Sequence, residues 1–125
     1  MKRFDTFIQY KPSHTIIFME VLEVEEVTEW REICKVRWFL LDKKGLNVQS
    51  NFRMCTADGK FANFVRLPRR AFLEAVRLMK QMDKEQKLLK ADSTDDTGDM
   101  AIRLLYVNTR RKVVRIINAN SAELA

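Results

Sequence analysis

The stretch FANFVRLPRRAFLEAVRLMKQM, residues Phe61–Met82, decides the expected fold because it contains the passage from sheet to helix. Pro68 lacks a backbone N–H and has a fixed φ, so it suits the first turn of a helix and pushes Leu67 toward extended geometry. From Arg69 to Lys90, strong helix formers dominate and neither Gly nor Pro occurs. The sequence therefore predicts a short strand that ends at Leu67 and leads directly into a helix.

The expected helix is amphipathic. Its apolar residues recur at helical spacing, and its other face is mainly basic: Phe72, Leu73, Val76 and Met79 against Arg69, Arg70, Glu74, Arg77, Lys80 and Lys84. We expect this helix to lie on a sheet with its basic face toward solvent.

Three β-rich runs precede this stretch, at Thr15–Val27, Ile33–Leu41 and Leu46–Thr56. Turn chemistry separates the later strands, first at Asp42–Gly45 and then at Asp58–Gly59. With the strand of the opening stretch, these runs predict a four-stranded meander over residues 14–67.

The remaining segments complete an expected ββββ-α-ββ order. Residues 1–13 read as an N-terminal arm or short strand, 68–90 as the helix, 91–99 as an acidic loop and 100–118 as a β-hairpin. The predicted fold class is α+β, with a curved antiparallel sheet and one main helix packed on one face. A length of 125 residues predicts a single domain, 1–125.

Composition limits the functions to consider. No long apolar span or signal-peptide pattern occurs, which predicts an intracellular protein, cytoplasmic or nucleoid-associated, without a membrane partner. Cys34 and Cys55 fall in expected strands as free thiols, and the single histidine, His14, makes a zinc site implausible. We therefore expect neither a metal nor a cofactor.

The formal net charge of +6 is unevenly distributed. Residues 1–32 carry four Lys/Arg against seven Asp/Glu, residues 33–90 carry fourteen against five, and residues 91–125 carry five of each. The basic centre favours an anionic partner, with nucleic acid first and an acidic protein second, and the alternative is plain solubility. The acidic stretch at 20–32 is interpreted as a solvated sheet edge.

Enzyme templates are absent from the sequence. Neither the glycine-rich phosphate loops nor the serine-nucleophile motif occurs, and neither cysteine has an activating signature. The carboxylates of the 91–99 loop leave a grafted active site as an open alternative, although solvent-facing acids are the usual interpretation. We expect a binding protein and not an enzyme.

The polar face of the predicted meander is the candidate binding site. Neighbouring strands lie about 4.8 Å apart, so their cationic and amide side chains would form one contiguous patch interleaved with aromatic rings. Cations that follow phosphates and rings that stack on bases are typical of single-stranded nucleic-acid binders. The alternative is an ordinary half-exposed sheet face with its rings turned inward. The candidate residues are Lys35, Arg37, Asn47, Gln49, Asn51, Arg53, Arg66, Phe39 and Phe64.

The segment Lys44–Met79, with a strand ending F-V-R-L followed by P-R-R-A-F and the helix, carries a resemblance. Four curved strands that enter a helix through such a joint are similar to the PUR-repeat and whirly-type single-stranded nucleic-acid binders, including the transcriptional positive cofactor group. The resemblance is one of topology. It implies pairing of copies through their helices and binding across the sheet face, with contacts from Lys35, Arg37, Arg53 and Arg66.

The sequence thus favours a single-stranded DNA- or RNA-binding protein that forms a homodimer. The alternative is a small protein-interaction module or inhibitor that docks on another protein through charged surfaces. The expected dimer rests on a sheet face left partly uncovered and on a 100–117 hairpin that could be exchanged between copies.

Overall fold

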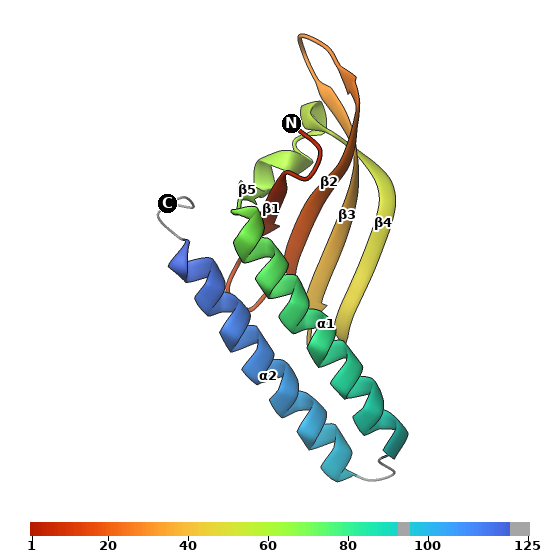
Figure 1. Cartoon of the computed structure of the whole chain (residues 1–125), viewed down its shortest axis with the longest axis vertical. Coiled ribbons are helices and arrows are strands. Elements are labelled where there is room, and N and C mark those ends of the chain that lie inside the picture. Colours follow the sequence, from red (N-terminus) through yellow and green to blue (C-terminus); the bar gives the residue numbers. More distant parts are fainter. Residues whose placement is uncertain (93–95, 121–125) are drawn as a thin grey trace.

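The computed structural model describes residues 1–92 and 96–120 and has an α+β architecture (Figure 1). An open five-stranded antiparallel sheet has the strand order β4-β3-β2-β1-β5. α1 crosses one face of this sheet, and α2 runs beside α1 (Figure 1). The strands are β1 (Thr6–Gln9), β2 (Ile16–Val27), β3 (Glu32–Asp42), β4 (Gly45–Cys55) and β5 (Val65–Arg66), and the helices are α1 (Arg69–Asp92) and α2 (Asp96–Ala119).

The three long strands β2, β3 and β4 confirm the predicted β-rich runs. The turn at Asp42–Gly45 is also confirmed, because Asp42 Oδ1 accepts the N–H of Lys44 at 2.8 Å. Gly45 has a φ of +127°, and a Cβ there would lie 2.9 Å from Oε1 of Gln86 on α1. Glycine therefore allows both the turn and the close approach of α1 to this end of the sheet.

The predicted fourth strand is wrong for most of its length. Lys60–Asn63 forms a 3₁₀ turn, and only Val65–Arg66 forms a strand, which pairs with β1 at the opposite edge of the sheet from β4. Phe61, Phe64 and Leu67 are all buried. Phe61 lies in the 3₁₀ turn, Phe64 follows it with extended backbone, and Leu67 follows β5, so the strand-like alternation of this stretch was misleading.

The hairpin predicted at 100–118 is wrong, because this segment belongs to α2. β-Branched residues and the Asn108-Thr109 pair suggested strands and a turn. The apolar positions instead repeat every three or four residues and pack toward α1, as Leu105, Thr109, Val113 and Ile117 do. The predicted helix at 68–90 is confirmed as α1, which begins one residue later and continues to Asp92.

The predicted acidic loop at 91–99 is wrong at both ends, which belong to α1 and α2. Its centre, residues 93–95, lies outside the described residues. The carboxylate site considered for this loop therefore falls partly on residues about which the structure gives no description.

Side chains are buried on both faces of the sheet. On the helix face, which we define as the face covered by α1, Phe72 packs with its ring centroid 6.0 Å from those of Phe18 and Phe39. On the opposite, far face, the chain passes through two 3₁₀ turns, Thr56–Asp58 and Lys60–Asn63, and Phe61 and Phe64 lie over β1–β3, with the ring centroid of Phe61 6.2 Å from that of Phe7. The apolar core therefore extends through the sheet.

Candidate nucleic-acid interface

The candidate residues of the meander do not form the single contiguous patch that was predicted. Residues directly paired across antiparallel strands point to the same face. The pairs Lys35 with Arg53 and Phe39 with Val48 place the strand cations on the helix face. Gln49 pairs with Trp38, and both lie on the far face, as does Asn47 opposite Leu40.

A β-bulge in β4 explains this division. The pairing with β3 shifts between Val36 and Arg37, where the extra residue is Asn51, with a φ of +63°. One inserted residue changes which face the following side chains occupy. Arg53 therefore reaches the helix face, although strict alternation had grouped it with Asn47 and Gln49.

The two candidate stacking rings are buried. Phe39 is 4% exposed beneath α1, and Phe64 is 8% exposed on the far face, with its ring centroid 5.6 Å from that of Trp38. Neither ring presents a face on which a base can stack. The predicted aromatic part of the patch is therefore wrong.

The candidate cations of the strands all have carboxylate partners. Lys35 lies 3.7 Å from Glu23, Arg37 lies 3.5 Å from Glu20, and Arg53 lies 3.1 Å from Glu25. These acids belong to the stretch at 20–32, so the interpretation of that stretch as only a solvated edge is wrong. Strand pairing brings it against the basic residues of β3 and β4.

Arg66 is also paired, at the β5 edge. Its guanidinium lies 3.2 Å from Asp5 and 5.1 Å from the centroid of the Phe7 ring, so it covers a residue of the far-face core. It is therefore separated from Lys35, Arg37 and Arg53, which lie on the helix face.

These ion pairs differ in their surroundings. The Glu20 side chain is 10% exposed and accepts hydrogen bonds from both Arg37, at 3.5 Å, and Arg69, at 2.9 Å. Such a buried carboxylate requires its partners. The pairs of Lys35 and Arg53 are more exposed, and pairs of that kind contribute only about 0–1 kcal/mol, so a phosphate can replace the carboxylate.

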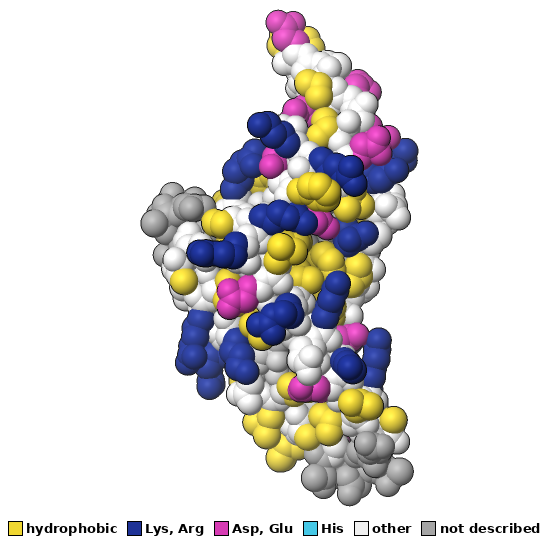
Figure 2. All heavy atoms as spheres, viewed as in Figure 1, with side chains coloured by type: hydrophobic (Ala, Val, Ile, Leu, Met, Phe, Trp, Pro, Cys, Tyr) yellow, Lys and Arg dark blue, Asp and Glu magenta, His cyan; other side chains and the backbone are white. Residues whose placement is uncertain are grey.

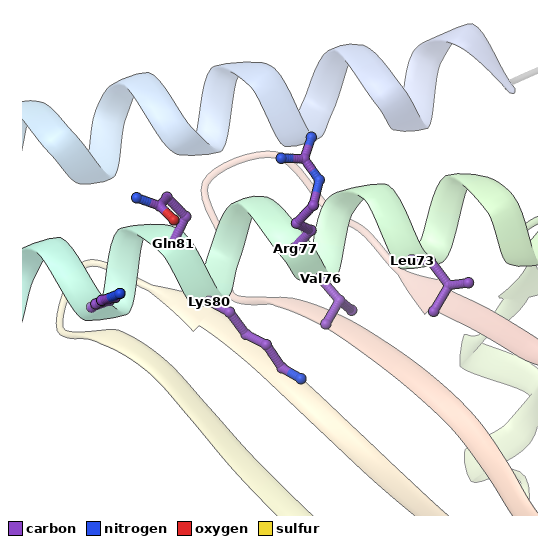
Figure 3. Close-up of a pocket in the computed structure, with 6 residues that line it drawn as sticks. Leu73, Val76, Arg77, Lys80 and Gln81 are labelled. Carbon is purple, nitrogen blue, oxygen red and sulfur yellow. The ribbon is translucent and has the colours of Figure 1, made fainter.

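A second cationic surface, which the sequence reasoning did not select, lies on α1. A shallow groove of about 430 Å³ is lined by Leu73, Val76, Arg77, Lys80, Gln81 and Lys84, and we call it the α1 groove. Figure 3 shows the side chains of Leu73, Val76 and Lys80 on the strand side of α1, with those of Arg77 and Gln81 on the side where α2 runs.

The α1 groove differs from the strands in its charge balance. Among ion pairs between described residues, none involves Arg77, Lys80 or Lys84. The spacing of these three residues, three and four apart, predicts one helical face. From the sequence, this face was expected to be solvated, and a charged partner for it was left open.

The α1 groove and the strand cations lie on the same side of the sheet. Lys80 Nζ lies 5.7 Å from the centroid of the Phe39 ring. Along β3, Arg37 and Lys35 follow Phe39 on this face at steps of two residues, about 6.6 Å each. We call the α1 groove together with Lys35, Arg37 and Arg53 the helix-side track. Figure 2, which views this side, shows Lys and Arg side chains with hydrophobic ones between them.

Three further features concern metal binding, the reactivity of Cys34 and membrane spans. The described residues contain no cluster of three or more His, Cys, Asp or Glu arranged to hold a metal. Burial, followed by the nearby Glu32 carboxylate, raises the pKa of the Cys34 thiol, which keeps it in the neutral, weakly nucleophilic form. Among the helices in the described ranges, none combines the length and the apolar character needed to cross a membrane.

Comparison with known proteins finds no relative. No protein-family model matches the chain, and neither the curated proteins nor the solved structures contain a significant match.

Proposed function

We propose that this protein binds single-stranded nucleic acid along the helix-side track, as a binding protein and not as an enzyme. The observation that carries the proposal is the α1 groove, where Arg77, Lys80 and Lys84 have no carboxylate partner among the described residues and surround the apolar side chains of Leu73 and Val76. Such a ligand is consistent with an intracellular location, in the cytoplasm or at the nucleoid.

The charge of the helical layer supports an anionic ligand. α1 and α2 together contain twelve Lys/Arg and six Asp/Glu. A polyanion that neutralises such cations releases its condensed counterions, which favours binding at low salt. The strand cations Lys35 and Arg53 extend the surface when phosphates replace Glu23 and Glu25, since these exposed pairs are weak.

The apolar part of the track suits unpaired bases. Leu73 is 50% exposed and Val48, opposite Phe39 on β4, is 45% exposed. A flexible single strand can turn its bases toward such side chains while its phosphates face the cations. Because Phe39 and Phe64 are buried, we expect little stacking and therefore little preference among base sequences.

Fluorescence anisotropy with a labelled strand of about 20 nucleotides tests the proposal. We expect binding that weakens linearly on a plot of log affinity against log salt concentration between roughly 50 and 200 mM. The double variant Lys80→Ala/Lys84→Ala loses two phosphate contacts, so the slope of this plot becomes shallower by about 1.4.

A matched control removes two lysines elsewhere. Lys11, in the β1–β2 connection, and Lys60, in the second 3₁₀ turn, are both exposed. The variant Lys11→Ala/Lys60→Ala has the same net charge as the α1 double variant, and we expect it to keep the wild-type slope. Absence of binding near 50 mM salt, or equal slopes for the two variants, would contradict the proposal.

A protein-interaction module remains the second candidate. Trp30, at the end of the β2–β3 hairpin, is 85% exposed on an acidic segment. Large exposed aromatic side chains with charged neighbours are common in protein-binding surfaces. This observation favours a protein partner for the hairpin, whatever binds the helix-side track.

A further inference from the structure

The β2–β3 hairpin ends in a projecting tip that holds a tryptophan in solvent. We call residues 25–32 the finger. Trp30 is 85% exposed and Val27 is 65% exposed. The N–H groups of Trp30 and Arg31 donate to Thr28 Oγ1 at 3.3 and 3.2 Å, and the Thr28 N–H donates to the Arg31 carbonyl at 2.9 Å. The turn is therefore ordered while its largest apolar side chain lies outside the core.

The finger is acidic around this apolar end. Residues 25–32 contain four glutamates and one arginine. Glu26 pairs with Arg31 at 3.3 Å, Glu25 with Arg53 at 3.1 Å and Glu32 with the N-terminal ammonium group at 3.1 Å, whereas Glu29, next to Trp30, has no partner among the ion pairs of the described residues. Figure 2 shows acidic side chains at the projecting end of the molecule, together with hydrophobic ones. A binding partner for the finger must offer apolar surface to Trp30 and a cation to the neighbouring Glu29.

The α1 groove has that combination. Leu73 and Val76 provide apolar lining, and Arg77, Lys80 and Lys84 provide positive charge that no described carboxylate neutralises. The groove, of about 430 Å³, is shallow and open, so a side chain would lie across it and not inside an enclosed cavity. Charge and apolar character are thus complementary between the finger and the α1 groove.

The finger of a chain cannot occupy the groove of the same chain. The groove lies beside Phe39, where Lys80 is 5.7 Å from the ring. The finger ends at Glu32, seven residues earlier on β3, which corresponds to about 23 Å at the rise of a strand. β3 is paired on both sides, with β2 and β4, and cannot fold back. The occupant must come from another molecule.

We propose that the finger of one copy docks in the α1 groove of a second copy, and that the second finger occupies the first groove. A tryptophan buries about 150–250 Å² at most, far below the roughly 1,200 Å² of a stable interface. Two reciprocal contacts bring the two helix-side tracks together and bury more surface. They also close the assembly as a two-fold dimer, whereas one-way contacts would continue into filaments.

This dimer differs from the one expected from the sequence, which rested on a partly covered sheet face and on a 100–117 hairpin that could either complete the sheet or be exchanged between copies. That segment is a helix, and a buried apolar cluster lies on each face of the sheet. The proposed dimer requires only that the finger fits the α1 groove, and it does not depend on nucleic-acid binding. If both proposals hold, dimerisation and nucleic acid compete for Lys80 and Lys84.

Sedimentation equilibrium over a concentration series measures the assembly. We expect a monomer–dimer equilibrium for the full chain. Trp30→Ala and Lys80→Glu should each weaken dimerisation by roughly 30-fold or more, as central interface residues do. The matched control is Met100→Ala, which truncates a residue on α2 that is 66% exposed and lies outside both the finger and the α1 groove. This control should dimerise like the wild type.

Tryptophan emission supplies a second measurement. The difference between the spectra of the wild type and Trp30→Ala isolates the emission of Trp30 from that of Trp38. This emission should shift to shorter wavelength as the concentration rises through the dimer range, because the indole leaves water. A monomer at every concentration, or dimerisation of folded Trp30→Ala equal to that of the wild type, overturns the proposal.

The two proposals fail in distinguishable ways. A labelled strand of about 20 nucleotides that binds and shifts the dimer to monomer supports both. A dimer that depends on Trp30 and Lys80, in a protein that binds no strand, supports the dimer alone and removes the proposed function. If the protein binds the strand but is monomeric at every concentration, the proposed function is supported and the dimer is removed.

Discussion

The cations of the strands and those of α1 lie on the same side of the sheet but in opposite electrostatic situations. Lys35, Arg37 and Arg53 each form an ion pair with a glutamate of β2. Arg77, Lys80 and Lys84 have no partner among the described ion pairs. The strand cations are neutralised within the protein, and those of α1 remain available to a ligand.

Local sequence does not reveal this difference. The acidic stretch at 20–32 and the basic residues of β3 and β4 are well separated in the chain, and antiparallel pairing brings them together with Glu20 opposite Arg37 and Glu23 opposite Lys35. Opposite charges placed directly across a strand pair attract each other. A basic stretch therefore predicts a ligand site only after its acidic neighbours in space are known.

The largest expected effect tests whether α1 is held over the sheet. Phe72 is 1% exposed and contacts both Phe18 and Phe39, so Phe72→Ala should lower the free energy of unfolding by about 3–5 kcal/mol. Leu73→Ala, at the adjacent and 50% exposed position, should cost less than about 1 kcal/mol. Urea denaturation measures both. Equal losses would mean that α1 is not anchored as described.

The next effect tests the structural role of the strand pairs. Glu20→Gln keeps the size of the side chain but removes the charge that holds Arg37 and Arg69. We expect a loss of about 2–3 kcal/mol in the free energy of unfolding, since hydrogen bonds to charged groups are among the stronger ones. Glu26→Gln, in an exposed pair with Arg31, is the control and should lose less than about 1 kcal/mol. If Glu20→Gln left the free energy of unfolding unchanged, the buried pair and the exposed pair would contribute equally to stability.

A smaller effect is expected when the strand cations lose their glutamate partners and become unpaired like those of α1. Glu23→Gln/Glu25→Gln releases Lys35 and Arg53 from exposed pairs. Affinity for a single strand should rise by up to about fivefold for each released cation, the value of a surface ion pair, with little change in stability. Anisotropy at low salt measures the gain. A decrease in affinity would show that these cations lie outside the binding surface.

The smallest effect concerns Arg66, which the sequence had placed in the binding site. Its pairing with Asp5 and its position over Phe7 separate it from the helix-side track. Arg66→Ala should leave affinity for a single strand unchanged and cost less than about 1 kcal/mol of stability. A loss of affinity as large as that of Lys80→Ala would move the binding surface to the β5 edge.

Much of the fold follows from short-range pattern. Pro68 and the uninterrupted helix formers after it indicated α1, and alternation with turn chemistry indicated β2, β3 and β4. The pattern failed where two periods are hard to separate over a short run. Phe61 lies in a short 3₁₀ turn inside a run that also alternates like a strand, and the β-branched residues of α2 concealed its helical repeat.

The candidate site was less predictable because it depends on contacts between distant residues. The excess of positive charge, the basic face of α1 and the exposed acidic stretch are properties of composition and helical spacing, and they can be derived from the chain alone. The bulge at Asn51, the burial of Phe39 and Phe64, and the glutamates opposite Lys35 and Arg37 arise only from the tertiary structure and the register of the sheet. Tertiary pairing therefore decides which charges are neutralised inside the protein and which stay available to a partner.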